Sequence, residues 1–85
     1  MAKYKILVKP SAVKEIDSLE KKDIIRITKK IQSLADDPRP MGSQKLSGQD
    51  RYRVRQGNYR IVYSVEDVVR IVRIVKAGHR RDVYR

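Results

Sequence analysis

The chain has 85 residues, no cysteine and a formal net charge of +11, from 21 Lys and Arg against 10 Asp and Glu. This length predicts one domain over residues 1–85 with a small core, and the lack of cysteine excludes disulfides and thiolate metal sites. No apolar run is long enough for a signal peptide or a membrane span, so we expect a cytoplasmic protein and no membrane partner. The charge alone predicts an acidic partner, which is a nucleic acid, an anionic membrane surface or an acidic protein.

The first half of the chain predicts one strand and two helices. A strand over residues 3–8 is ended by Pro10, which cannot donate to a central ladder. Ser11 and Asp23 are the predicted N-caps of the two helices. Two prolines and a glycine in residues 36–42 end the second helix, and a polar connection follows. Apolar residues at helical spacing predict the buried faces: Ala12, Val13, Ile16 and Leu19, then Ile24, Ile27, Ile31 and Leu34.

The second half predicts three strands, over residues 52–56, 59–65 and 68–77. Gly57-Asn58 is a strong two-residue hairpin signal, whereas Glu66-Asp67 is a weaker one. The last strand is largely apolar on both faces, which indicates a central position. The order predicts an α+β fold in which two helices cover one face of a small, mainly antiparallel four-stranded sheet.

Arginines alternate with apolar residues along the first hairpin. If Gly57-Asn58 forms the turn, Arg60 lies directly opposite Arg55, on the face away from the helices, with Arg53 beside them. The tyrosines and aliphatic residues between them fall on the helix-covered face. A two-residue turn at 66–67 would also place Arg73 opposite Arg60, giving a row of three arginines across three strands.

Two interpretations of this face remain open. The arginines extend apart into water as an ordinary solvated surface, or they form a binding site for an anion. Like charges directly opposite each other destabilise a sheet, and Arg is suited to bidentate contact with phosphate. The high net charge therefore favours the anion site.

The segment that begins at Gly78 places several candidate residues near one rim of the sheet: His79, Arg80, Arg81 and Tyr84. His79 is the only histidine, and its side-chain type titrates near neutrality, although a lone histidine is more often structural. Tyr84 is a candidate for the core, for stacking or for proton donation. No cluster of His, Asp and Glu has metal-ligand spacing, so we expect no metal site.

Four stretches together resemble the RelE/ParE superfamily of bacterial toxins, and most of all its RelE branch: "KILVKPSAVKEIDSL", "DDPRPMGSQKLSG", "YRVRQGNYRIVYSV" and "VKAGHRRDVYR". The resemblance implies a single RelE-like toxin domain over the whole chain. It also implies a ribosome-dependent endoribonuclease, which cuts mRNA in the decoding site and is held inactive by an acidic antitoxin.

The resemblance also implies catalytic residues: Arg53, Arg55, Arg60, Arg80 and Tyr84. The family's C-terminal arginine aligns with Arg80, with one residue of slack towards Arg81. Well-known RelE enzymes carry lysines where Arg53 and Arg55 stand. Arginine stays protonated and cannot act as a base, which puts a base role at these two positions in doubt.

The implied reaction is attack of the substrate's 2′-OH on the adjacent phosphate, without metal or cofactor. The arginines would stabilise the transition state, and His79 is the candidate base on pKa grounds. Further RNA contacts are predicted at Lys45, Arg51, Arg73 and Arg81. One alternative is a ParE-like inhibitor that binds DNA gyrase and cleaves no RNA. Another is a general RNA-binding module, which the lack of an aromatic stacking surface disfavours.

Overall fold

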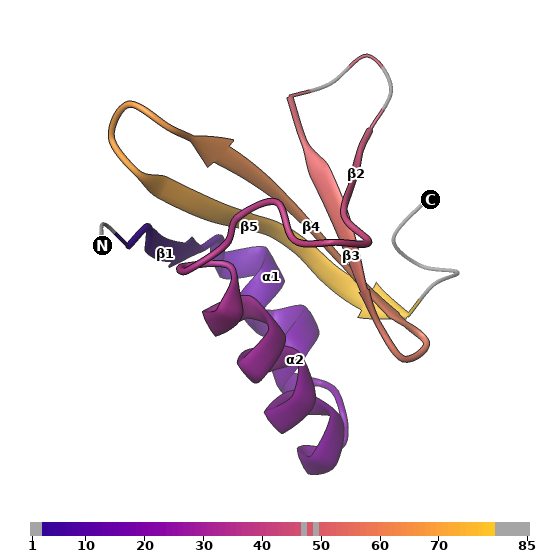
Figure 1. Cartoon of the computed structure of the whole chain (residues 1–85). Helices are drawn as coiled ribbons and strands as arrows, with labels where there is room; N and C mark the ends of the chain where they lie inside the picture. The colour runs from indigo at the N-terminus through magenta and orange to yellow at the C-terminus, as the bar shows by residue number, and fades with distance from the viewer. Residues whose placement is uncertain (1–2, 47, 49, 80–85) are drawn as a thin grey trace.

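Two helices pack against one face of a five-stranded sheet in the computed structural model of the chain (Figure 1), which describes residues 3–46, 48 and 50–79. The elements are β1 (Lys5–Val8), α1 (Pro10–Asp17), α2 (Lys21–Ser33), β2 (Gln44–Lys45), β3 (Tyr52–Gln56), β4 (Tyr59–Glu66) and β5 (Ile71–His79). The predicted α+β class is confirmed. The predicted strand number was one too low, because β2 forms within the stretch predicted as a polar connection.

The strand order in the sheet is β1-β5-β4-β3-β2. β1 runs parallel to β5, and the other neighbouring strands pair antiparallel. The predicted central position of the last strand is confirmed, since β5 lies between β1 and β4. The first strand, β1, lies at the edge of the sheet beside β5.

The N-caps of the two helices lie two and three residues earlier than the sequence predicted. Lys9 is the N-cap of α1, and Pro10 occupies the first turn, where its missing N–H needs no partner. Glu20 is the N-cap of α2. Asp23 therefore lies inside the first turn of α2, where a carboxylate is favourable to the helix dipole.

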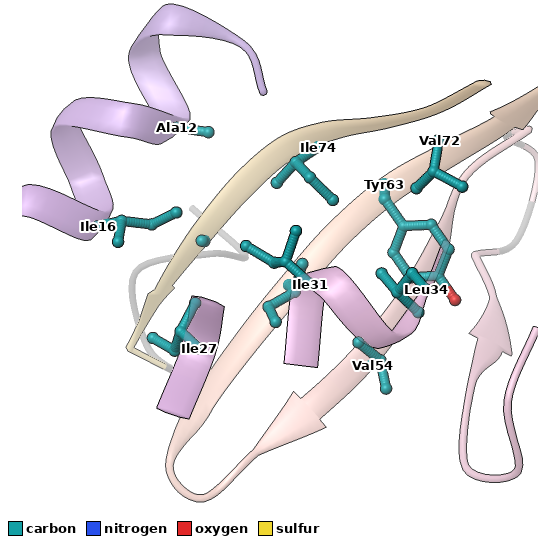
Figure 2. Packing of buried hydrophobic residues seen from close by; sticks show 11 residues of the cluster. Ala12, Ile16, Ile27, Ile31, Leu34, Val54, Tyr63, Val72 and Ile74 are labelled. Atoms are coloured by element: carbon teal, nitrogen blue, oxygen red, sulfur yellow. The ribbon is translucent and has the colours of Figure 1, made fainter. Parts of the chain in front are cut away.

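The core lies between the helices and the covered face of the sheet (Figure 2). Figure 2 shows Ile31 of α2 near Ile74 and Leu34 beside the ring of Tyr63. The predicted helix stripes are confirmed for the most part, except that Val13 is 42% exposed on α1. The fully enclosed residues are Ala12, Ile27, Leu34, Ile61, Tyr63, Val72, Ile74 and Ala77, each 0% exposed.

An ion pair joins the segment after α2 to the β4–β5 turn. Arg39 donates to both carboxylate oxygens of Asp67, from Nη1 to Oδ1 at 3.1 Å and from Nη2 to Oδ2 at 2.8 Å. The Arg39 Nε donates to the Tyr52 hydroxyl at 3.1 Å, and the Tyr4 hydroxyl donates to Asp67 at 2.7 Å. Asp67 thus links three segments that are distant in the sequence. The guanidinium of Arg39, and then the hydroxyl of Tyr4, lower the pKa of Asp67 from 3.8 to about 2.

We expect Asp67→Asn to lower the melting temperature near neutral pH and to reduce the acid sensitivity of folding. The folded-state pKa of Asp67 is depressed, so its contribution is full above the ordinary value of 3.8 and is lost as the pH falls through about 2. Thermal unfolding followed by circular dichroism across this range measures the effect. Asp17→Asn, on the exposed surface of α1, is the control, and equal acid profiles for the two variants would contradict the assignment.

Candidate functional site

The face of the sheet opposite the helices, here called the open face, carries three arginines close together. Arg55 lies directly opposite Arg60 in the β3–β4 register, and Arg53 lies opposite Val62. The predicted hairpin at Gly57-Asn58 is confirmed, together with the pairing that follows from it. We refer to Arg53, Arg55 and Arg60 as the arginine cluster.

The arginine cluster is not an ordinary solvated surface. Arg60 is 5% exposed and Arg53 is 8% exposed, whereas Arg55 is exposed. The Arg53 Nη2 donates to the Oε1 of Gln44, the β2 residue directly opposite it. The interpretation in which all the arginines extend apart into water is therefore wrong for Arg53 and Arg60.

Burial sets the electrostatic environment of Arg53 and Arg60, the two buried members of the arginine cluster. A guanidinium remains protonated at every physiological pH, and removing it from water is costly unless it is paired or hydrogen-bonded. Arg55 and Arg60 hold directly opposed positions on neighbouring strands, and like charges so placed repel each other. An oxyanion placed between them would relieve that repulsion, and the reduced solvent screening would strengthen the contact.

The rest of the open face is also basic. Val62 and Val75 form a small apolar cluster there with Leu46 packed against it. Strand alternation places six cations on this face of the described strands and one carboxylate, Glu66. The six cations are Lys5, Arg53, Arg55, Arg60, Arg73 and Lys76.

Arg73 does not lie opposite Arg60, contrary to the prediction. Its partner in β4 is Ser64, about 13 Å along the strand from Arg60 at the usual rise per residue. Gly78 takes the position opposite Arg60. Arg73 instead lies with its Nη2 3.8 Å from the Oε2 of Glu66.

Two local irregularities cause this shift in register. The β4–β5 connection uses four residues, 67–70, in place of the predicted two, and Arg70 adopts a left-handed φ of 55°. A β-bulge between the pairs of Val62 and Tyr63 adds one more residue to β5. The predicted strand over 68–77 is therefore observed two to three residues later.

His79 lies at the end of β5, on the face away from the arginine cluster. It is directly opposite Tyr59, and the two rings meet edge to face with centroids 5.9 Å apart. The Tyr59 hydroxyl donates to Asp23 of α2 at 3.0 Å, an interaction that raises the pKa of the phenol. The structure therefore groups His79 with the helix-covered face and does not bring it beside Arg60.

Two of the predicted RNA contacts lie at the β2 side of the sheet. Lys45 is opposite Tyr52, whose ring packs on the helix-covered core, so Lys45 points away from the arginine cluster. Arg51 is exposed just before β3, and its carbonyl accepts from the Leu46 N–H at 2.8 Å. Gln44, which contacts Arg53, was missed because no sequence pattern predicted β2.

The remaining predicted site residues, Arg80, Arg81 and Tyr84, lie outside the described residues. Within residues 3–46, 48 and 50–79, no group of three or more His, Asp or Glu is arranged to hold a metal ion. No helix in the described part of the chain has the length and apolar character needed to cross a membrane.

The sequence matches a family model described as the ParE toxin of type II toxin–antitoxin systems, over residues 6–84. It is also 33% identical over 87 residues to a RelE-like toxin protein of Escherichia coli, covering 96% of this chain and 90% of that protein. These matches confirm the family resemblance drawn from the sequence.

Solved structures with the same fold include toxin chains in complex with their antitoxins. The archaeal RelE–RelB complex from Pyrococcus horikoshii OT3 matches with a TM-score of 0.84 and 30% identity, covering 94% of this chain and 98% of that chain. The intact E. coli RelBE toxin–antitoxin complex matches with a TM-score of 0.78 and 28% identity, covering 89% of this chain and 95% of that chain.

Proposed function

The chain belongs to the ParE toxin family of type II toxin–antitoxin systems, and we propose that it acts as a ribosome-dependent endoribonuclease that cleaves mRNA. The observation that carries this proposal is the arginine cluster. Two arginines, Arg55 and Arg60, are directly paired across neighbouring strands, and two members of the cluster are almost fully buried. That geometry suits a phosphate whose negative charge increases during the reaction.

In the proposed reaction, the 2′-OH of the substrate attacks the adjacent phosphorus and the 5′-oxygen departs. Fixed donors aimed at the developing charge lower the barrier, because they need no reorganisation when the charge appears. Arg53, Arg55 and Arg60 have this role, with Arg80 as a further member predicted from the sequence. The ribosome would orient the substrate, which explains how a site with few acid–base groups suffices.

The proton transfers need groups other than the arginine cluster. Arginine cannot act as a base, and His79 packs against Tyr59 on the helix-covered face. Tyr84 is the proposed acid, base or stacking residue. The RNA backbone on either side of the site would contact Arg51, Arg73 and Arg81. Lys45 is the weakest of the predicted contacts because it lies opposite Tyr52.

We expect Arg55→Ala and Arg60→Ala each to reduce the single-turnover rate of cleavage of ribosome-bound mRNA by about 10²-fold. An interaction made mainly in the transition state lowers the rate with little change in ground-state affinity. Binding to programmed ribosomes, measured in parallel, should therefore change much less than the rate.

Arg26→Ala is the matched control, since Arg26 is an exposed arginine on α2. At saturating protein we expect its cleavage rate to equal that of the wild type. Undiminished cleavage by an Arg55→Ala, Arg60→Ala double variant would refute the role of the arginine cluster.

His79→Ala tests the general-base role predicted from the sequence. Because the His79 ring lies against Tyr59, we expect the variant to have a lower melting temperature than the wild type. We expect its pH–rate profile to keep the wild-type shape. Single-turnover cleavage across a pH series, with thermal unfolding alongside, provides both measurements. Loss of the acidic limb near the pKa of histidine would instead restore His79 as the base.

The second candidate function is inhibition of DNA gyrase by protein binding. The family model that matches the chain is named for ParE, and ParE-like members of the superfamily are the expected gyrase inhibitors. A supercoiling assay with purified gyrase distinguishes the two. Inhibition of supercoiling by a wild type that leaves ribosome-bound mRNA intact would replace the nuclease proposal.

An acidic antitoxin is the proposed protein partner, supported by the antitoxin-bound structures that the chain resembles. The net charge of +11 and the basic open face predict that electrostatic attraction contributes much of the affinity. We therefore expect the dissociation constant of the cognate complex to increase with ionic strength, because salt screens exposed charges. Calorimetric titrations at low and high salt measure this, and an unchanged affinity would show that apolar contacts dominate.

A further inference from the structure

A surface hollow lies beside the arginine cluster, between the loop before β2 and the end of β3. It has a volume of about 330 Å³ and is lined by Lys30, Met41, Gly42, Gln44, Arg53, Val54 and Arg55. We refer to it as the Met41 pocket. Its volume is at the low end of the range of about 300–1,000 Å³ that is usual for small-molecule sites.

The charges lining the Met41 pocket favour an anionic ligand. Lys30, Arg53 and Arg55 contribute three cations, and none of the described residues that line the hollow is a carboxylate. A second hollow, between the start of α2 and the β3–β4 turn, is lined by Glu20 and Asp23 together with its cations. A third is lined by Asp50, Glu66 and Asp67 beside a single arginine. Of these three hollows, the Met41 pocket is the one suited to a phosphate group.

The same pocket offers apolar and hydrogen-bonding groups. Met41 is 101% exposed, so its thioether projects fully into solvent. A thioether makes favourable contacts with aromatic rings. Gln44 accepts from Arg53 through Oε1, and its amide nitrogen provides donors of its own. Gly42 has a φ of 94° and leaves open space where a Cβ would stand.

We propose that the Met41 pocket binds one nucleotide of the mRNA next to the cleaved bond. The base contacts the Met41 thioether and the Gln44 amide, while its phosphate lies towards Lys30 and Arg55. This inference rests on the proposed nuclease function and extends it by naming a determinant of sequence preference. Arg53 and Arg55 belong to both the pocket and the arginine cluster, so a nucleotide bound here is adjacent to the reacting phosphate.

The first test compares the cleavage sites of the wild type and Met41→Ala on ribosome-bound mRNA. We expect kcat/KM to fall about 10-fold, mainly through KM, because the lost contact is ground-state binding. The relative use of cleavage sites should also change. Val68→Ala is the matched control, since Val68 is 97% exposed in the β4–β5 turn. Gln44 is left unaltered because it also contacts Arg53.

The second test does not require cleavage. The chain has two methionines, so methyl-labelled methionine gives a simple spectrum in which Met41→Leu assigns the Met41 signal. We expect saturable shifts of the Met41 methyl on addition of AMP, GMP, CMP or UMP, and smaller shifts with inorganic phosphate. Shifts in that order would support a nucleotide site.

Two outcomes would overturn the proposal. One is wild-type cleavage with an unchanged site profile and rate in Met41→Ala, which rejects the pocket while leaving the nuclease function intact. The other is a Met41 methyl that responds to the cognate antitoxin but to none of the nucleotides, which would assign the pocket to a protein partner. If the wild-type protein cleaved no ribosome-bound mRNA, the proposed nuclease function itself would be rejected.

Discussion

The register of the β3–β4 hairpin is the constraint on which both the core and the arginine cluster depend. A slip of one residue would exchange the two faces of a strand. The pairing that buries Ile61 and Tyr63 beneath the helices is therefore the same pairing that places Arg60 opposite Arg55. Gly57, with a φ of 60°, allows the tight turn that holds this register. Loss of the register would disrupt the hydrophobic core as well as the arginine cluster. The free energy that stabilises the core therefore also maintains the position of the arginines.

Alternation and turn chemistry predicted this hairpin because both signals are local. The position of Arg73 was not predictable in the same way. It depends on a four-residue turn without glycine, in which Arg70 adopts a left-handed conformation, and on a bulge in β5 that has no sequence signature. The side of the sheet that His79 faces depends on the bulge, which lies between Arg73 and His79 in β5 and shifts the alternation by one residue. β2 was missed because a strand of two residues gives no periodic pattern.

The burial of Arg53 and Arg60 could not be predicted from the sequence either. A pattern assigns a residue to a face, but exposure depends on which distant segment covers that face. Gln44 reaches Arg53 across the β2–β3 pairing, and Leu46 packs beside it against Val62. Buried guanidinium groups are costly for a small domain with limited core area. That cost is consistent with a function in which the cations must be positioned before a ligand binds.

The parallel pairing of β1 with β5 has a consequence for biosynthesis. Residues 5–8 obtain their sheet partners from residues 71–74, near the other end of the described chain. β5 also lies between β1 and β4, so the β1–β5 and β4–β5 pairs cannot form until β5 has been synthesised. Such non-local contacts slow folding, because a long loop must close before they form. The complete sheet therefore forms only after residues 71–79 have been synthesised, so the growing chain lacks the partner of β1 until that point.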